Sequence, residues 1–272
     1  MTPYHPPILS QASLQDYTDC PRRFQLRFVE RLNYPAVESE PALENEKHQQ
    51  EGQYFHQLVH AHLIGVPAEK LSRLANTTNL ERWWQNYLGV DLDINEYEKH
   101  PEFTLSAPLA NVRLVAKYDL LAVKPGGRAL IFDWKTYRKR PRPEWLAARL
   151  QTRVYRALLG QAGAQLNRDE PFIPEQIEMV YWFADFPEDP LRFEYSAAQF
   201  KRDWDLLTKL AQEIASASEY PKTDDRQRCS YCPYRSYCDR GIRAGDFEDL
   251  QAELAAEELF DVNFEQIGEI AF

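Results

Sequence analysis

Three charged residues in the middle of the chain could carry out metal-assisted hydrolysis. Asp119 lies within an apolar stretch, and Asp133 and Lys135 follow a second one. Two carboxylates among apolar residues are costly unless a cation neutralises them, and a divalent metal ion would do so. Asp133 and Lys135 are two residues apart, so on a strand their side chains point to the same face. Two carboxylates and an ammonium group on one sheet face suit metal-assisted hydrolysis of a phosphodiester bond.

Two strands joined by a turn must position these residues. Residues 114–123 are rich in apolar and β-branched side chains, and residues 129–132 lead directly into Asp133. The segment between them, Lys124-Pro125-Gly126-Gly127-Arg128, has the proline and glycines of a turn. The pattern predicts a hairpin with an acidic residue on each strand. A surface hairpin with a buried ion pair would explain this stretch equally well.

A helix upstream of the hairpin could supply an imidazole ligand. Residues 43–64 have helical periodicity and include His56. Gly52 lies inside this predicted helix, where glycine costs about 1 kcal/mol relative to alanine, so we expect close packing at that turn. The alternative is a partly buried structural histidine, because His60 and His62 lie on the same helix.

A later helix, predicted over residues 143–160, begins at a proline and ends at a glycine. Gln151 and Tyr155 are four residues apart and share one face, at the border of the apolar side. A residue at that border can contact both the core and a ligand. By itself, an ordinary amphipathic helix is the simpler explanation.

Four cysteines form a set of soft metal ligands. Cys229, Cys232 and Cys238 lie close together late in the sequence, and Cys20 lies near its start. Four thiolates suit a [4Fe–4S] cluster or a tetrahedral Zn²⁺ ion, and spacing alone does not separate the two. In a reducing compartment a metal site is favoured over two disulfides.

Length and composition indicate a globular protein. The 272 residues can bury a sizeable core, and 44% hydrophobic and 27% charged residues are ordinary values. The net charge of −10 has the wrong sign for a protein that coats nucleic acid non-specifically, although a carboxylate-rich metal site is itself negative. We see no secretory signal and no membrane-spanning run, so we expect a cytoplasmic protein.

The predicted elements follow the order of an α/β domain. Residues 1–242 are expected to form one domain and residues 243–272 an acidic tail. Besides the hairpin, strands are predicted over 102–109 and 177–183, and helices over 10–31, 43–64, 80–88, 143–160 and 197–216.

Together these motifs resemble the PD-(D/E)xK nuclease superfamily, and within it the RecB- and AddB-like iron–sulfur nucleases, which are similar to CRISPR-adaptation exonucleases. Between Ser13 and Cys238 the parts occur in the order of that family: Cys20, Gly52 with His56, Asp119, Asp133-Trp134-Lys135, Gln151 with Tyr155, and then three cysteines. One departure is that Tyr118, and not proline, precedes Asp119. No Gly-x-x-x-x-Gly-Lys-Ser/Thr phosphate loop occurs, so we expect a nuclease without a fused helicase motor.

The resemblance implies a restriction-endonuclease-like central mixed sheet flanked by helices, with N- and C-terminal segments joined by the four-cysteine cluster. It implies an iron–sulfur cluster at Cys20, Cys229, Cys232 and Cys238, with zinc as the less favoured metal. It also implies that His56, Asp119 and Asp133 bind Mg²⁺ or Mn²⁺, and the imidazole favours Mn²⁺.

The resemblance further implies a deoxyribonuclease, and specifically an exonuclease acting on single-stranded or free-ended DNA in repair. Asp119, Asp133 and Lys135 would be the catalytic residues. Metal-bound water would attack phosphorus in line, and Lys135 would orient that water or stabilise developing negative charge. Gln151 and Tyr155 would position the DNA strand.

Two other functions remain open at this point. One is an iron–sulfur DNA-binding factor in repair or CRISPR adaptation that does not cleave DNA. The complete set of His, Asp, Asp and Lys argues against it. The other is a zinc-stapled interaction protein. Visible absorption by anaerobically purified protein would separate an iron–sulfur cluster from zinc.

Two further segments could contact partners. Arg138-Lys139-Arg140-Pro141-Arg142 follows Lys135 and is either a phosphate-binding strip or a solvated loop. The acidic tail, residues 243–272, is amphipathic. We favour docking on the protein's own surface, and the alternatives are a protein partner or a cover for the basic strip.

Overall fold

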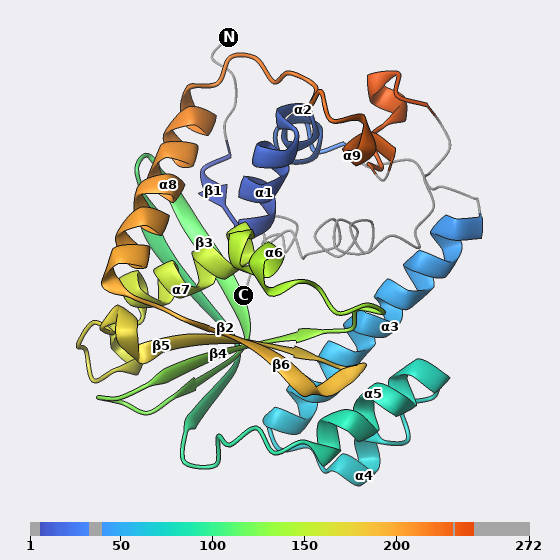
Figure 1. The fold of residues 1–272 in the computed structure, drawn as a ribbon, viewed down its shortest axis with the longest axis vertical. Helices are drawn as coiled ribbons and strands as arrows, with labels where there is room; N and C mark the ends of the chain where they lie inside the picture. Colours follow the sequence, from blue (N-terminus) through green and yellow to red (C-terminus); the bar gives the residue numbers. More distant parts are fainter. Residues whose placement is uncertain (1–5, 33–39, 231, 242–272) are drawn as a thin grey trace, which may run out of the picture.

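A central mixed sheet organises the molecule (Figure 1). The computed structural model describes residues 6–32, 40–230 and 232–241. In this part of the chain the sheet has six strands in the order β1-β3-β4-β5-β6, with β2 on the other edge of β3. They are β1 Ile8–Leu9, β2 Glu98–Leu109, β3 Val112–Val123, β4 Ala129–Lys135, β5 Ile177–Phe183 and β6 Phe186–Glu194. The mixed sheet flanked by helices confirms the α/β, restriction-endonuclease-like fold class.

Helices cover both faces of the sheet. The helices are α1 Gln11–Asp19, α2 Pro21–Phe24, α3 Glu40–Leu63, α4 Ala68–Leu71, α5 Thr78–Gly89, α6 Pro143–Ala148, α7 Leu150–Ala162, α8 Ala197–Ser216 and α9 Arg226–Ser230, and Gln25–Val29 forms a short π-helix. α1, α7 and α8 pack on one face, in a core that includes Leu14, Val154 and Leu207. α3 and α5 pack on the other. No helix of the described residues is long and apolar enough to cross a membrane.

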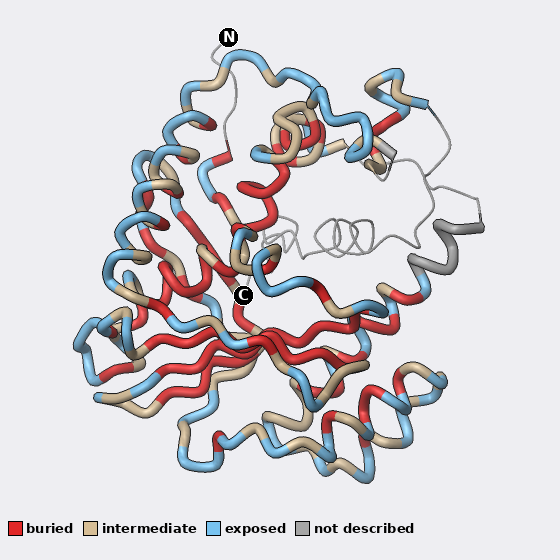
Figure 2. Tube along the Cα trace, in the orientation of Figure 1, coloured by how far each residue is buried: buried red, intermediate tan, exposed pale blue. Residues whose placement is uncertain are grey.

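β4 and β5 form the buried centre of the sheet. They pair in parallel, with Asp133 beside Tyr181 and Lys135 beside Phe183. Every residue of both strands is buried, as the central red band in Figure 2 shows. Parallel strands covered on both faces are typically apolar along their whole length. Asp133 and Lys135 are therefore exceptions that need a partner or a function.

The predicted hairpin is confirmed. β3 and β4 pair antiparallel from Val123 with Ala129 to Leu120 with Phe132. Gly126 has φ of +82°, a backbone conformation that glycine adopts without steric cost. The Gly127 amide donates to the Lys124 carbonyl, 2.7 Å away, and closes the turn.

The structure differs from the sequence-based elements at several places. The short strand β1 was not predicted, and β2 begins at Glu98, four residues before the predicted start. The single helix predicted over 143–160 is broken at Arg149, whose extended backbone (φ −64°, ψ 145°) separates α6 from α7. The sequence does not predict β6, because Pro187 and Pro190 are unfavourable in strands. β6 is the last strand of the sheet, and an edge strand tolerates residues that have no amide hydrogen.

Candidate active site

The two acidic residues lie at the same end of the hairpin. Asp119 on β3 and Asp133 on β4 are the next residues beyond the last pair of the ladder, Leu120 with Phe132. Like charges close together on neighbouring strands repel each other, so this end of the hairpin needs cations or hydrogen-bond donors. The Trp134 amide supplies one, since it donates to Oδ2 of Asp119 at 2.9 Å.

His56 is the histidine of α3 that reaches these carboxylates. Its Nδ1 is 3.4 Å from Oδ2 of Asp119. His62 lies elsewhere, with Nδ1 3.1 Å from the Tyr87 hydroxyl. The structure therefore brings His56, and not His62, to Asp119.

Gly52 allows α3 to come this close. A Cβ atom at Gly52 would lie 2.8 Å from Oγ1 of Thr136, the residue directly after β4. Real Cβ atoms essentially never make so short a contact, so a larger residue would force Thr136 or α3 to shift. The close packing expected from the glycine is confirmed, and it explains why His56, one turn later, faces the hairpin.

Both oxygens of the Asp133 carboxylate have a polar partner. Its Oδ2 is 2.8 Å from Nζ of Lys135, and its Oδ1 accepts a hydrogen bond from Nε2 of Gln151 at 2.8 Å. Asp133 is 2% exposed and Lys135 5% exposed, so this ion pair is screened little by water. Gln151, predicted to lie at the border of the apolar face of its helix, thus contacts the Asp133 carboxylate.

Tyr155 lies in the core. It is 4% exposed, and its hydroxyl donates to the Lys117 carbonyl at 2.9 Å. The Tyr118 hydroxyl in turn donates to the Tyr155 carbonyl, also at 2.9 Å. These bonds fasten α7 to β3, so Tyr155 orients the helix that carries Gln151.

The charges of His56 and Asp119 stabilise each other. Burial acts to lower the pKa of His56, but the Asp119 and Asp133 carboxylates together outweigh it, and the pKa is raised. Burial acts to raise the pKa of Asp119, but His56, the Trp134 amide and Lys135 together lower it. The site therefore holds an ionised carboxylate beside an imidazole that binds a proton more readily than usual.

The chemistry of these donors fits a divalent cation. Carboxylate oxygens suit Mg²⁺ and Mn²⁺, and an imidazole nitrogen is better tolerated by Mn²⁺. Two carboxylates at one end of the hairpin also supply the negative charge that such an ion neutralises. In this structure the Asp133 carboxylate contacts Lys135 and Gln151. Among the described residues, no group of three or more His, Cys, Asp or Glu side chains is placed to hold a metal ion.

The tertiary structure brings Cys20 to the three later cysteines. Cys20, Cys229, Cys232 and Cys238 all line one pocket, together with Arg23. All four are free thiols. Burial raises the pKa of Cys232 to about 11, and the positive charge of Arg23 opposes this shift.

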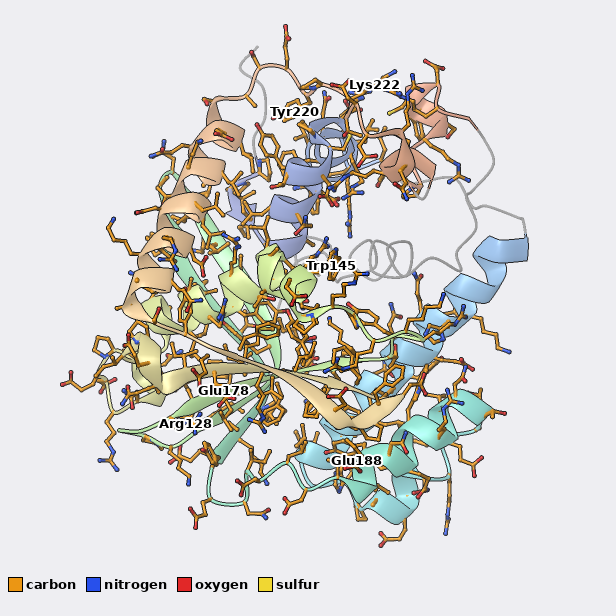
Figure 3. All side chains as sticks on the ribbon, viewed as in Figure 1. Arg128, Trp145, Glu178, Glu188, Tyr220 and Lys222 are labelled. Carbon is orange, nitrogen blue, oxygen red and sulfur yellow. The ribbon has the colours of Figure 1, made fainter. Side chains whose placement is uncertain are left out.

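Other contacts hold the same two ends of the domain together. The Tyr220 ring is 6.0 Å from that of Phe24, and the Arg22 amide donates to the Pro221 carbonyl at 3.2 Å. The Tyr234 hydroxyl donates to the Leu32 carbonyl at 2.9 Å. Within the C-terminal segment, Lys222 donates to the Cys238 carbonyl at 2.7 Å. Figure 3 labels Tyr220 and Lys222 along this C-terminal segment.

The basic strip after Lys135 is partly neutralised. Arg140 pairs with Asp189 of β6 at 2.9 Å, and its Nε also donates to the Asp189 carbonyl. The acidic tail, residues 243–272, lies outside the described residues, so the interpretations given for it stay predictions.

Comparison with known proteins bears on the family and the fold of this chain. The model of the PD-(D/E)XK nuclease superfamily matches residues 8–239. A solved structure from Eubacterium rectale, described as a candidate exonuclease, is similar with a TM-score of 0.50 and 9% identity, over 80% of this chain and 85% of that one. The structure of SSO0001 matches with a TM-score of 0.44 and 12% identity, over 86% and 87%. No curated protein sequence matches significantly.

Proposed function

The chain belongs to the PD-(D/E)XK nuclease superfamily, and on that premise we propose that it is a metal-dependent deoxyribonuclease, an exonuclease acting on single-stranded or free-ended DNA. The observation that carries the proposal is the meeting of His56 with Asp119, and of Lys135 with Asp133, at the same end of one hairpin. The resemblance to RecB- and AddB-like nucleases and the fold shared with a candidate exonuclease support the exonuclease assignment.

Each residue of the set has a distinct role in this proposal. His56, Asp119 and Asp133 would hold Mg²⁺ or Mn²⁺. When bound, the ion supplies an acidified water and neutralises charge at the phosphate. Lys135 orients the attacking water or stabilises the negative charge that develops at phosphorus. Gln151 fixes the orientation of Asp133, and Tyr155 contributes to strand binding by holding α7 in place.

The four cysteines form the second part of the proposal. They line one pocket beside a buried arginine, which suits the negative charge of thiolate ligands. We assign them to a [4Fe–4S] cluster, with Zn²⁺ as the less favoured ion. None of the four belongs to the His56, Asp119, Asp133 and Lys135 set, so this centre is structural.

Digestion of end-labelled DNA tests the proposed activity. Single strands labelled at the 5′ or the 3′ end are incubated with Mn²⁺ or Mg²⁺, and with EDTA as the control. We expect metal-dependent release of mononucleotides or short products, with the label at one end of the strand released before the label at the other. Circular single strands should not be cleaved. Cleavage of circles would reject the exonuclease assignment, and intact DNA in every reaction would reject the nuclease.

A pair of histidine variants tests the metal ligand on α3. His56→Ala should raise the Mn²⁺ concentration for half-maximal cleavage by about tenfold or more, because even outer-shell changes have effects of about 10–100-fold. His60→Ala is the matched control, one turn later on α3, and should behave like the wild type. Equal metal dependence of the two variants would show that His56 is not a ligand.

A further inference from the structure

α7 begins without a cap of its own. Arg149 precedes its first residue, Leu150, and the Arg149 side chain makes no capping hydrogen bond to the amides of the first turn. The first amides of a helix have no partner within the helix and need one from outside. Here Oε1 of Gln15, from α1, accepts the hydrogen bond of the Leu150 amide at 3.2 Å. Gln15 is 8% exposed, so water does not easily replace this bond.

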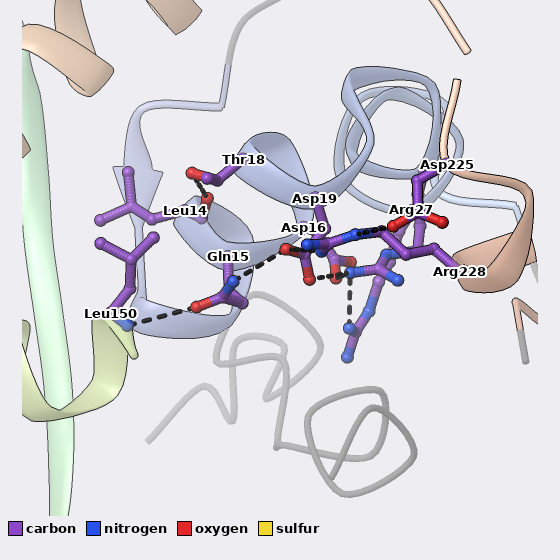
Figure 4. A network of polar contacts seen from close by, with 10 residues as sticks. Leu14, Gln15, Asp16, Thr18, Asp19, Arg27, Leu150, Asp225 and Arg228 are labelled. Carbon is purple, nitrogen blue, oxygen red and sulfur yellow. Dashed lines mark hydrogen bonds and ion pairs between the residues drawn. The ribbon is translucent and has the colours of Figure 1, made fainter. Parts of the chain in front are cut away.

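The other end of the Gln15 amide is also fixed. Its Nε2 donates to Oδ1 of Asp19 at 3.0 Å. Asp19 is in turn paired with Arg23 at 3.1 Å and with Arg228, the residue before Cys229. Figure 4 shows this line of contacts from Leu150 through Gln15 to Asp19 and Arg228. Because one end of the amide faces a backbone donor and the other a carboxylate, only one orientation of Gln15 satisfies both.

The capped residue is the neighbour of a residue in the active site. Gln151 follows Leu150 and donates to Asp133 at 2.8 Å. One turn before Gln15, Nε2 of Gln11 lies 3.5 Å from the Tyr155 hydroxyl. Two glutamines four residues apart on α1 therefore contact α7 beside Gln151 and Tyr155, the two residues of the motif on α7.

We infer that Gln15 is a positioning residue for the reaction: it caps α7 from α1 and so sets the place of Gln151, which holds Asp133. This inference rests on the proposed nuclease function. Gln15 itself touches none of the reacting groups. Through Asp19 and Arg228 it also links the cysteine-bearing segment to the start of α7.

Hydrogen exchange tests the cap without any need for cleavage. Gln15→Met has a similar volume but offers the Leu150 amide no comparable acceptor. We expect the amides at the start of α7 to exchange about fivefold faster than in the wild type, the factor that one typical cap is worth. Gln212→Met, at an exposed position of α8, is the control and should leave exchange unchanged. Unchanged exchange in Gln15→Met would overturn the cap.

A double-mutant cycle tests the positioning role. Single-turnover cleavage at saturating DNA and Mn²⁺ should fall about fivefold in Gln15→Met, with little change in the DNA concentration for half-saturation. In a Gln151→Met background the same change should cause no further loss, because no Gln151 remains to be positioned. If the double variant instead loses cleavage by the product of the two single-variant factors, the positioning role is overturned, while the cap is unaffected.

The two experiments separate this inference from the proposed function. If the wild type does not cut DNA, the nuclease proposal fails, the positioning role fails with it, and the exchange result still decides the cap. If Gln15→Met does not fold, Gln15→Asn replaces it, since asparagine keeps the amide but is one methylene too short to reach Leu150. Wild-type exchange and cleavage in a folded Gln15→Asn would then overturn the inference.

Discussion

Replacing Asp133 by asparagine should reduce DNA cleavage by about 10³-fold or more and leave the protein folded. Asparagine would keep the size of the side chain but lose the charge that attracts a divalent ion and pairs with Lys135. Single electrostatic contacts at a reacting phosphate or carbonyl are worth about 10²–10³-fold, and Asp133 is proposed to serve both metal and water. The measurement is single-turnover cleavage of end-labelled DNA, with a melting curve for each variant.

Asparagine is preferred to alanine for a structural reason. Lys135 is 5% exposed, and asparagine at position 133 keeps an oxygen that can accept a hydrogen bond from its ammonium group, whereas alanine removes both the charge and the acceptor. Removing one partner of a buried ion pair outright typically costs about 3–5 kcal/mol, which would confuse loss of folding with loss of chemistry. Lys135→Met is the complementary variant and should be equally inactive.

The control for both variants is Asp205→Ala. Asp205 lies on α8, is 65% exposed at its side chain and pairs only with Lys201 among the described residues. Exposed pairs of this kind contribute less than about 1 kcal/mol, so activity and melting temperature should stay at wild-type values. Cleavage at the wild-type rate by Asp133→Asn in saturating Mn²⁺ would refute the proposed mechanism.

Replacing Cys20 by alanine should destabilise the whole domain. Most of the chain lies between Cys20 and Cys229, and the proposed metal centre joining them would close it into a loop. Cross-linking a loop of about 100 residues is worth roughly 4.7 kcal/mol in the chain-entropy model, against a total of about 5–15 kcal/mol for a native domain. The melting temperature should fall by on the order of 10 °C.

The same variant should lose its visible absorption and become protease-sensitive near its ends. Activity per folded molecule should persist, because Cys20 touches none of the residues proposed to bind metal or DNA. Ser236→Ala, an exposed change within the same cysteine-bearing segment, should retain colour, stability and protease resistance. An equally stable and resistant Cys20→Ala protein would show that Cys20 does not join the two ends.

Sequence alone determined the features that depend on neighbouring residues. The period of two along a strand placed Asp133 and Lys135 on one face, and the ion pair between them agrees with that placement. The turn glycines predicted the hairpin, which brings Asp119 and Asp133 to the same end, just beyond its last pair. Gly52 signalled a close approach of its helix because glycine inside a helix is otherwise costly. Each inference uses sterics or periodicity that act within a few residues.

Tertiary structure decided which distant groups meet. His56, His60 and His62 are alike in sequence, and only the docking of α3 against Thr136 turns His56 towards Asp119. The break at Arg149 has no proline or glycine to announce it, and Gln15 serves there as a cap because α1 packs against α7. Such contacts depend on how apolar faces from separate parts of the chain pack together, and that packing is a property of the folded whole and not of any one segment.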